Sequence, residues 1–349
     1  MIRASLTGLL LRYTTALIFI AVLLYFGAQA PNFLGPESLA NIVKQASFTG
    51  VIAIGMTFVL LTAGIDLSVG SNMYLSAMAT SAILSNPAMQ NAPGVTVAIL
   101  AGLATGVVFG AVNAFCVVVL RITPFLVTLA TMVVGRGLGT AFTESLGIEI
   151  PDIFAKFGSW SLFRAPDASM GNPALDYLVA LSAALTALPT LTFALVVVCA
   201  YIVLSRTQFG RQIYAIGNDA EAARKAGINV DRVLFAAYVI CGLGAAIGGV
   251  TLISLIGRLN QTFGVGREFN VITAAVLGGT SLFGGVGTAL GAVVGSTLVQ
   301  AVQSGMTFIK VNPYLQPMVM AAVIFMAIFI DALRTSRLEK LRRRMLRAD

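Results

Sequence analysis

The sequence of 349 residues contains no histidine and only three cysteines. Without histidine the chain cannot form a Ser-His or Cys-His nucleophile pair, nor a His-ligated metal or haem site. Cys116, Cys199 and Cys241 lie in apolar runs without CxxC spacing, which is typical of structural thiols. We therefore expect neither a catalytic site nor a metal site in this chain.

Charged residues are also scarce. The 22 Lys and Arg and 14 Asp and Glu residues make up 10% of the sequence, whereas 58% of it is apolar. A soluble domain carries roughly 25% charged residues, so a water-soluble chain of this length could not cover its surface. This balance excludes soluble, nucleic-acid-binding and disordered proteins despite the net charge of +8. The sequence predicts a polytopic protein whose solvent is the lipid bilayer.

Ten apolar stretches are long enough to cross, or nearly cross, a hydrocarbon core of about 30 Å. They predict an all-α bundle of about ten transmembrane helices, some broken or half-length, at residues 13–28, 42–62, 68–84, 95–120, 124–142, 177–204, 233–256, 271–283, 286–308 and 314–330. The stretch 271–283 is too short to span the membrane unless it is a half-helix or uses flanking residues. The first stretch imitates a signal peptide, but its length and the following Pro31 favour a retained helix.

Basic residues are distributed unevenly between the connecting segments. With both termini in the cytoplasm, the inner segments hold fifteen Lys and Arg and the outer segments hold six. The positive-inside rule favours this orientation. The chain then has a cytoplasmic N-terminus (1–12), a membrane domain (13–332) and a basic cytoplasmic tail (333–349). The membrane domain includes a long outer loop (144–176) and a long cytoplasmic loop (205–232).

The outer loop contains the only tryptophan of the sequence, Trp160, together with five acidic residues. The tryptophan and its apolar neighbours predict an amphipathic segment at the membrane surface. The acidic residues leave a second interpretation open, in which the loop is a docking face for an external partner.

Glycine occurs in helical rows, at Gly102, Gly106 and Gly110, at Gly244 and Gly248, and at Gly287, Gly291 and Gly295. In lipid such rows let helix backbones approach closely, although a glycine-lined pore wall is an alternative. Residues 278–288 superficially suggest a phosphate loop, but no lysine precedes the threonine and no soluble strand precedes the segment. The segment instead predicts a break between half-helices, formed by Gly278, Gly279, Thr280, Ser281, Gly284 and Gly285.

The long cytoplasmic loop contains the signals of a two-turn helix. Asn218 or Asp219 can cap its start, basic Arg224 and Lys225 fall in its last turn, and Gly227 can supply a left-handed stop. So short a helix is marginal alone in water. We expect it to pack either against its own bundle or against a separate cytoplasmic protein.

Glu221-Ala222-Ala223, followed after three residues by Gly227, matches the EAAxxxG loop of bacterial ABC-importer permeases. The segments 64–70 (GIDLSVG), 214–218 (YAIGN) and 277–282 (LGGTSL) resemble the ribose-type sugar permeases of that group. The likeness extends from about residue 39 to residue 331. The Leu-Pro pair of the wider permease motif is missing after Gly227, as it is in the ribose-type group.

This resemblance implies a permease subunit of an ABC importer in the bacterial inner membrane. Such a subunit translocates a monosaccharide (a ribose-like pentose, a hexose or a related polyol) by alternating access. In this family the loop forms a coupling helix that sits in a groove of the ATPase. The resemblance thereby assigns ATPase coupling to Gly217, Asn218, Asp219, Glu221, Ala222, Ala223, Arg224 and Gly227.

The resemblance also implies the partners. They are a second permease subunit, in a homodimer or heterodimer, a cytoplasmic ABC ATPase and an external or periplasmic sugar-binding protein. We expect this chain to bind no cofactor of its own, because its sequence contains no nucleotide site; ATP and Mg²⁺ belong to the partner ATPase.

Two ionisable residues, Asp66 and Arg136, lie inside the predicted spans, where charge is costly and usually functional. Asp66 can cap the following helix or take part in gating, and Arg136 can snorkel towards an interface. The residues predicted to line a path for a neutral solute are Asp66, Ser68, Asn72, Asn113, Thr131, Asn270 and Thr273. Hydrogen bonds between helices explain several of these residues equally well.

Alternatives from other classes are weaker. A branched-chain amino acid permease of the same superfamily is the main one. An ion-coupled secondary transporter needs buried carboxylates, for which Asp66 is the single candidate. An intramembrane hydrolase needs a Ser-His pair or two aspartates, which the predicted spans do not supply.

Overall fold

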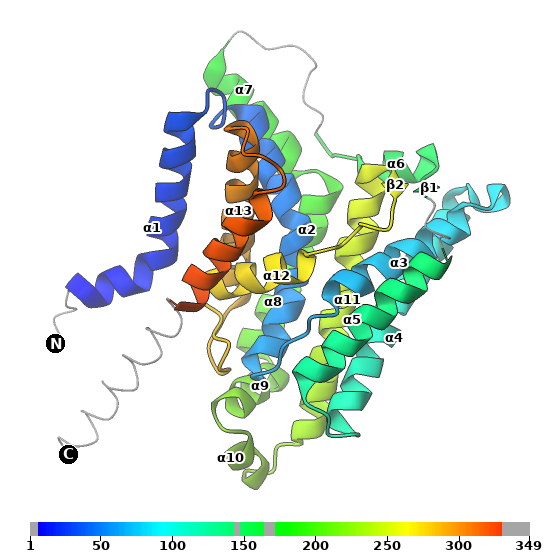
Figure 1. The fold of residues 1–349 in the computed structure, drawn as a ribbon, viewed down its shortest axis with the longest axis vertical. Helices are drawn as coiled ribbons and strands as arrows, with labels where there is room; N and C mark the ends of the chain where they lie inside the picture. The colour runs from blue at the N-terminus through cyan, green and yellow to red at the C-terminus, as the bar shows by residue number, and fades with distance from the viewer. Residues whose placement is uncertain (1–5, 143–146, 164–171, 330–349) are drawn as a thin grey trace.

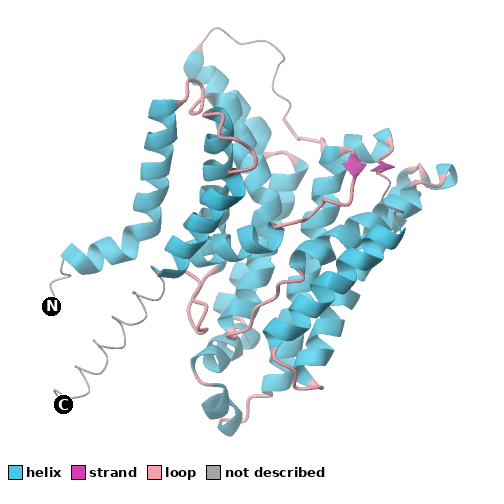
Figure 2. Cartoon of the chain, in the orientation of Figure 1, coloured by secondary structure: helices cyan, strands magenta, loops and turns pink. Residues whose placement is uncertain are grey.

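The computed structural model describes residues 6–142, 147–163 and 172–329, and most of them are helical (Figures 1 and 2). The predicted basic tail (333–349) therefore lies outside the described residues. The helices are α1 (Leu6–Gln29), α2 (Pro36–Leu61), α3 (Val69–Leu84), η1 (Pro87–Met89), α4 (Ala92–Val118), α5 (Pro124–Phe142), α6 (Asp152–Gly158), α7 (Pro173–Leu185), α8 (Leu188–Arg206), α9 (Gln208–Asn218), α10 (Ala220–Lys225), α11 (Val230–Ile256), α12 (Arg267–Leu277), α13 (Ala289–Phe308) and a C-terminal helix (Gln316–Phe329).

The predicted all-α membrane fold is confirmed for the described ranges. Five helices there, α2, α4, α5, α8 and α11, are long and apolar enough to cross a membrane. The strands found there are β1 (Ile148–Glu149) and β2 (Arg258–Leu259), which pair antiparallel with Ile148 opposite Leu259. This pair lies at one end of the bundle and α10 lies at the other (Figure 1).

The structure divides one predicted span and decides the form of another. The stretch 177–204 is divided into α7 and α8 at Thr186 and Ala187. Pro189 occupies the first turn of α8, where its missing N–H costs nothing, so the sequence begins a new helix there. The stretch 271–283 is helical only as far as Leu277, and α12 has 11 residues. It is therefore a half-helix.

The helices fall into two sets of similar order. Helix α2 packs against α12 and α13, and α11 correspondingly packs against α3 and α4. In each set a non-helical segment precedes the short helix, 62–68 before α3 and 257–266 before α12. Helices α2 and α11 run in opposite directions along the bundle (Figure 1). This arrangement is an inverted repeat, which transporters commonly use to build a site where the two repeats meet.

The two short helices meet near their N-termini. A Cβ placed on Gly70 of α3 would collide with the carbonyl oxygen of Gly264, and a Cβ on Gly264 would collide with the carbonyl oxygen of Gly70. Gly264 also has a φ of 75°, which side chains rarely adopt. Glycine at both positions therefore lets the interrupted segments of the two repeats cross in direct backbone contact.

The glycine row of α4 is a packing surface. A Cβ on Gly106 would lie 2.7 Å from the carbonyl oxygen of Gly242 in α11, and one on Gly110 would lie 2.6 Å from the carbonyl oxygen of Tyr238. The backbones of α4 and α11 thus touch along this row, which is the close approach that small residues permit in lipid.

We expect Gly106→Val to lower the free energy of unfolding by about 1–3 kcal/mol, the usual range for overpacking a filled interface. Gly137→Val in α5 is the matched control. Apart from its chain neighbours and the backbone of its own helix, a Cβ at Gly137 would have no atom within 4 Å. Thermal unfolding of the two purified variants in detergent measures the difference. Equal unfolding midpoints would contradict the close contact between α4 and α11.

Candidate functional site

The predicted short helix of the cytoplasmic loop is α10, and Asp219 caps it. The Oδ1 atom of Asp219 accepts hydrogen bonds from the backbone N–H groups of Glu221 at 3.0 Å and Ala222 at 2.9 Å. Asn218, the other capping candidate, donates its Nδ2 to the carbonyl oxygen of Tyr214 at 2.9 Å. The turn after α10 contains Gly227 with a φ of 84°. Helix α10 projects from the end of the bundle (Figure 1).

The surface of α10 carries exposed charges. Glu221 and Lys225 form an i,i+4 ion pair at 2.8 Å, with side chains that are 79% and 75% exposed. Ala223 is the buried residue of this helix. Most of the helix therefore remains available for contact with another molecule.

Sequence reasoning missed α9, the helix that joins α8 to α10. Its residues Gly210, Ile213 and Ile216 are buried against the bundle, and Thr207 caps its start through a hydrogen bond from the Gly210 N–H at 3.2 Å. The spacing of its apolar residues by three is the signal of an amphipathic helix. The helix has only 11 residues, and polar side chains and glycines interrupt its apolar pattern, so the signal is weak.

The end of α9 contacts the end of α2 and the segment 278–288 between α12 and α13. A Cβ on Gly217 would collide with the carbonyl oxygen of Leu61, at the end of α2, and with the backbone nitrogen of Gly285. The Gly285 N–H in turn donates to the Leu61 carbonyl oxygen at 2.9 Å. We call this contact between α9, the end of α2 and the segment 278–288 the junction.

Tyr214 adds a side-chain hydrogen bond to the junction. Its hydroxyl donates to the carbonyl oxygen of Gly287 at 2.8 Å. Burial raises the pKa of this phenol above its ordinary value of 10.0, so the hydroxyl keeps its proton and remains a donor at physiological pH.

The segment 278–288 contains the residues predicted to form a helix break. Helix α12 ends at Leu277 and α13 begins at Ala289, with the intervening residues outside any helix. Gly279, Gly284 and Gly285 have φ values of 90°, 88° and 71°, which glycine adopts without steric cost. Thr280 and Ser281 are buried in the same segment.

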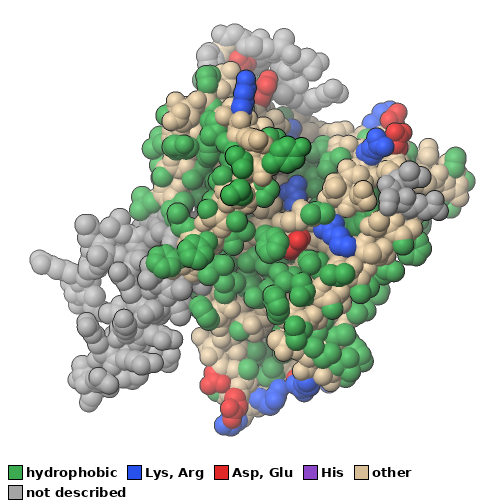
Figure 3. All heavy atoms as spheres, viewed as in Figure 1, with side chains coloured by type: hydrophobic (Ala, Val, Ile, Leu, Met, Phe, Trp, Pro, Cys, Tyr) green, Lys and Arg blue, Asp and Glu red, His purple; other side chains and the backbone are tan. Residues whose placement is uncertain are grey.

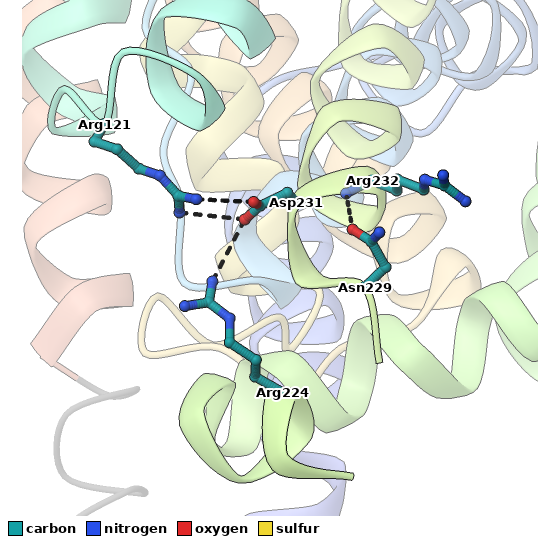
Figure 4. Close-up of polar contacts among 5 residues, drawn as sticks. All are labelled: Arg121, Arg224, Asn229, Asp231 and Arg232. Atoms are coloured by element: carbon teal, nitrogen blue, oxygen red, sulfur yellow. Dashed lines mark hydrogen bonds and ion pairs between the residues drawn. The ribbon is translucent and has the colours of Figure 1, made fainter. Parts of the chain in front are cut away.

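A second connection of α10 runs through Asp231 at the start of α11 (Figure 4). Arg121, in the turn between α4 and α5, donates to both carboxylate oxygens of Asp231, at 2.8 and 3.2 Å. Arg224 of α10 lies 3.4 Å from the same carboxylate. The side chains are 41–61% exposed, so each pair stabilises the protein only weakly. Together they connect the α4–α5 turn, α10 and the start of α11.

Four residues of the predicted solute path form a buried network between α3, α4 and α11. Asp66 accepts hydrogen bonds from the backbone N–H of Ser68 at 2.9 Å and from its hydroxyl at 2.5 Å. Asn113 donates to the same hydroxyl at 2.7 Å. Asn72 donates to the carbonyl oxygens of Gly106 and Gly242, at 3.3 Å each. The bonds of Asp66 and Ser68 thus satisfy polar groups where the chain is interrupted before α3, and those of Asn72 tie α3 to the middle of α4 and α11.

The remaining path residues lie elsewhere. The hydroxyls of Thr131 and Thr273 donate to backbone carbonyls of their own helices, and Thr273 is buried. Asn270 lines a cavity of about 1410 Å³ between α2, α12, α13 and the C-terminal helix. The other six predicted path residues do not line this cavity, and a role for them in transport stays a prediction.

Arg136 extends towards the crossing of the repeats. Its Nη1 donates to the carbonyl oxygen of Phe263 at 2.5 Å, and its guanidinium lies 5.8 Å from the ring centroid of Tyr74. Glu268, in the first turn of α12, is buried close by against Gly70. Figure 3 shows acidic and basic side chains near the middle of a largely hydrophobic face. Glu268 is buried and Arg136 is partly buried, and ionisable groups of both signs within the membrane-spanning part of a protein usually mark a functional site.

The comparisons with known proteins cover most of the chain. The chain is 32% identical to the galactose/methyl galactoside import permease protein MglC of Haemophilus influenzae, over 93% of this chain and 94% of the relative. It is 33% identical to the ribose import permease protein RbsC of Escherichia coli, over 86% and 88%. For RbsC of Bacillus subtilis the identity is 34%, over 86% of each chain. No solved structure matches the chain.

The profile of one protein family matches residues 38–328, from the start of α2 almost to the end of the C-terminal helix. The match includes both repeats, the cytoplasmic loop with α9 and α10, and the segment 278–288. The chain therefore belongs to the family described as the permease component of the branched-chain amino acid transport system.

Proposed function

We propose that this chain is the membrane-spanning permease subunit of an ABC importer for a monosaccharide, such as a ribose-like pentose, a hexose or a related polyol. The observation that carries the proposal is the relationship to galactose and ribose import permeases over at least 86% of this chain. The family description mentions branched-chain amino acids, but these relatives import sugars, which favours a sugar as the cargo.

The proposal includes partners and an orientation. A separate ABC ATPase binds ATP and Mg²⁺ and receives α10 in a groove, a second permease subunit completes the membrane unit, and a sugar-binding protein docks outside. Helix α10 and both termini face the cytoplasm of a bacterial cell, and β1, β2 and α6 face outwards. The excess of basic residues on the α10 side supports this orientation.

The junction gives the proposed movement a route into the membrane. When the ATPase displaces α10, α9 moves with it, and Gly217 and Tyr214 transfer the displacement to α2 and the segment 278–288. The Asp231 ion pairs link α10 to the α4–α5 turn and to α11. Elements of both inverted repeats therefore respond to one helix, as rigid-body alternating access requires.

The proposal is tested by reconstitution into liposomes. The permease alone should accumulate neither D-ribose nor D-galactose under a proton or sodium gradient. Addition of the ATPase and the binding protein of the same importer should make uptake of one of these sugars dependent on ATP. Gradient-driven accumulation by the permease alone would refute the proposal and favour a secondary transporter.

Docking of the ATPase on α10 is tested by Glu221→Lys. The variant should weaken assembly with the ATPase about 10-fold or more, because a reversed charge in a complementary interface is repelled. The permease itself should keep its unfolding midpoint, since the Glu221 side chain is 79% exposed. Asp152→Lys in α6 is the control, as it reverses an exposed charge at the opposite end. Equal ATPase affinity of both variants would exclude α10 as the docking element.

Transmission through the junction is tested by Tyr214→Phe. The variant should lose about 0.5–1.5 kcal/mol of stability with the hydrogen bond to Gly287, and ATP-driven uptake should slow while the ATPase still binds. Tyr201→Phe in α8 removes the hydroxyl of an exposed tyrosine and is the matched control. Uptake rates and ATPase affinities of the two variants are compared directly. An unchanged uptake rate for Tyr214→Phe would show that the hydrogen bond takes no part in coupling.

A further inference from the structure

The cavity that contains Asn270 is the feature that the coupling route leaves unexplained. It has a volume of about 1410 Å³ and lies between the N-terminal half of α2, the start of α12, the C-terminal half of α13 and the C-terminal helix. These parts of α2 and α13 lie at the end of the bundle opposite α10 (Figure 1). The cavity exceeds the roughly 300–1,000 Å³ typical of pockets for small ligands, so a solute in it would retain part of its water.

Carboxamides dominate the polar lining of this cavity. Seven Asn and Gln side chains line it, compared with two charged side chains, Glu37 and Arg267. A carboxamide both donates and accepts hydrogen bonds without carrying charge. Such a lining matches hydroxyl groups, which also donate and accept, better than it matches an ion.

Several of these polar groups have no hydrogen-bond partner among the residues that the structure describes. Among the described residues, none forms a side-chain hydrogen bond with the carboxamides of Asn41, Asn270 or Gln303. These three side chains all line the cavity. A carboxamide can both donate and accept hydrogen bonds, so a ligand that supplies the missing bonds is favoured.

One pair of carboxamides is held in a fixed orientation. The Nε2 of Gln300 donates to the Oε1 of Gln45 at 2.9 Å and to the hydroxyl of Ser304 at 3.2 Å. This pair joins α2 to α13 across the cavity wall. Part of the lining is therefore preorganised, whereas Asn41, Asn270 and Gln303 are left to adapt to a solute.

Aromatic faces complete the lining. Phe269 of α12 and Phe325 of the C-terminal helix both line the cavity and are exposed. The C–H face of a sugar ring is apolar and packs on an aromatic ring, while its hydroxyls point to the sides. An uncharged polar lining with flanking aromatic rings thus fits a polyhydroxylated ring.

We propose that this cavity is a low-affinity binding site for a neutral monosaccharide, and that Asn41, Asn270 and Gln303 hydrogen-bond its hydroxyls. The inference rests on the proposed function and adds the place in this chain that receives the sugar. Because the cavity is wide and only part of its lining is fixed, binding is weak. Weak binding lets the sugar enter from the binding protein and leave again.

The site is tested with the permease–ATPase complex in nanodiscs, without the binding protein. Saturation-transfer difference NMR should detect D-ribose or D-galactose bound to the wild-type complex. Asn41→Leu and Gln303→Met should each weaken that binding about 2- to 12-fold, the loss expected for one uncharged hydrogen bond. Gln261→Met is the matched control, because Gln261 is an exposed carboxamide outside the cavity lining.

A labelling experiment covers the case in which these variants fold poorly. Gln303→Cys, with Cys116 and Cys199 replaced by serine, is alkylated with a water-soluble maleimide. The sugar should slow alkylation at least about 2-fold, and betaine at the same concentration should not. Equal protection by both solutes, or equal NMR binding by the cavity and control variants, would overturn the assignment.

These outcomes separate the site from the function. If the complete importer transports neither sugar in an ATP-dependent manner, the proposed function fails. If it transports one of them while Asn41→Leu and Gln303→Met transport and bind as well as the wild type, the function holds and this site is wrong. Absence of any sugar signal from the wild-type complex, with transport intact, also refutes the site.

Discussion

The architecture depends on satisfying the backbone groups that the helix interruptions release inside the membrane. Lipid offers no hydrogen bonds, so irregular backbone is tolerated at this depth only where protein groups replace water. In one interrupted segment a carboxylate accepts from a free N–H group, and in the other a guanidinium donates to a free carbonyl group. Asp66 accepts the N–H of Ser68 before α3, and Arg136 donates to the carbonyl of Phe263 before α12. Close glycine contacts then let these segments lie against one another.

Close backbone contacts at glycines also connect the membrane-spanning part to the end of the bundle that carries α10. Glycine rows bring α4 against α11, and Gly291 and Gly295 of α13 lie against the α12 end in the same way. Gly217 extends this contact to α9. From α9, which directly precedes α10, the route to the end of α2 and to the segment 278–288 consists of direct backbone contacts and short hydrogen bonds. Displacements pass through such contacts with little slack because packed interfaces are hard to compress.

The sequence predicts the membrane class, the short α12 and the cap of α10, because apolar length, glycine clusters and capping residues act locally. It does not predict α9, the break before Pro189 or the inverted repeat. Arg121 and Asp231 are 110 residues apart and meet only after folding. Likewise, the sequence indicates Asn270 as a polar candidate for the solute path, but the cavity requires α2, α13 and the C-terminal helix to come together. The relationship to known permeases supplied the function, since neither composition nor spacing specifies a cargo.

The crossing of α3 and α12 has a consequence for the energy source. Each helix N-terminus contributes a partial charge of about +0.5, so the two N-termini together with Arg136 and Arg267, the first residue of α12, bring about three positive charges to this region. Asp66 and Glu268 bring two negative charges if both are ionised. With both carboxylates ionised, the protein's own groups leave this region with a net charge of about +1, which repels a proton or a sodium ion instead of attracting one. A neutral cargo can pass such a centre without a co-transported ion, so the work of concentrating it has to come from another source.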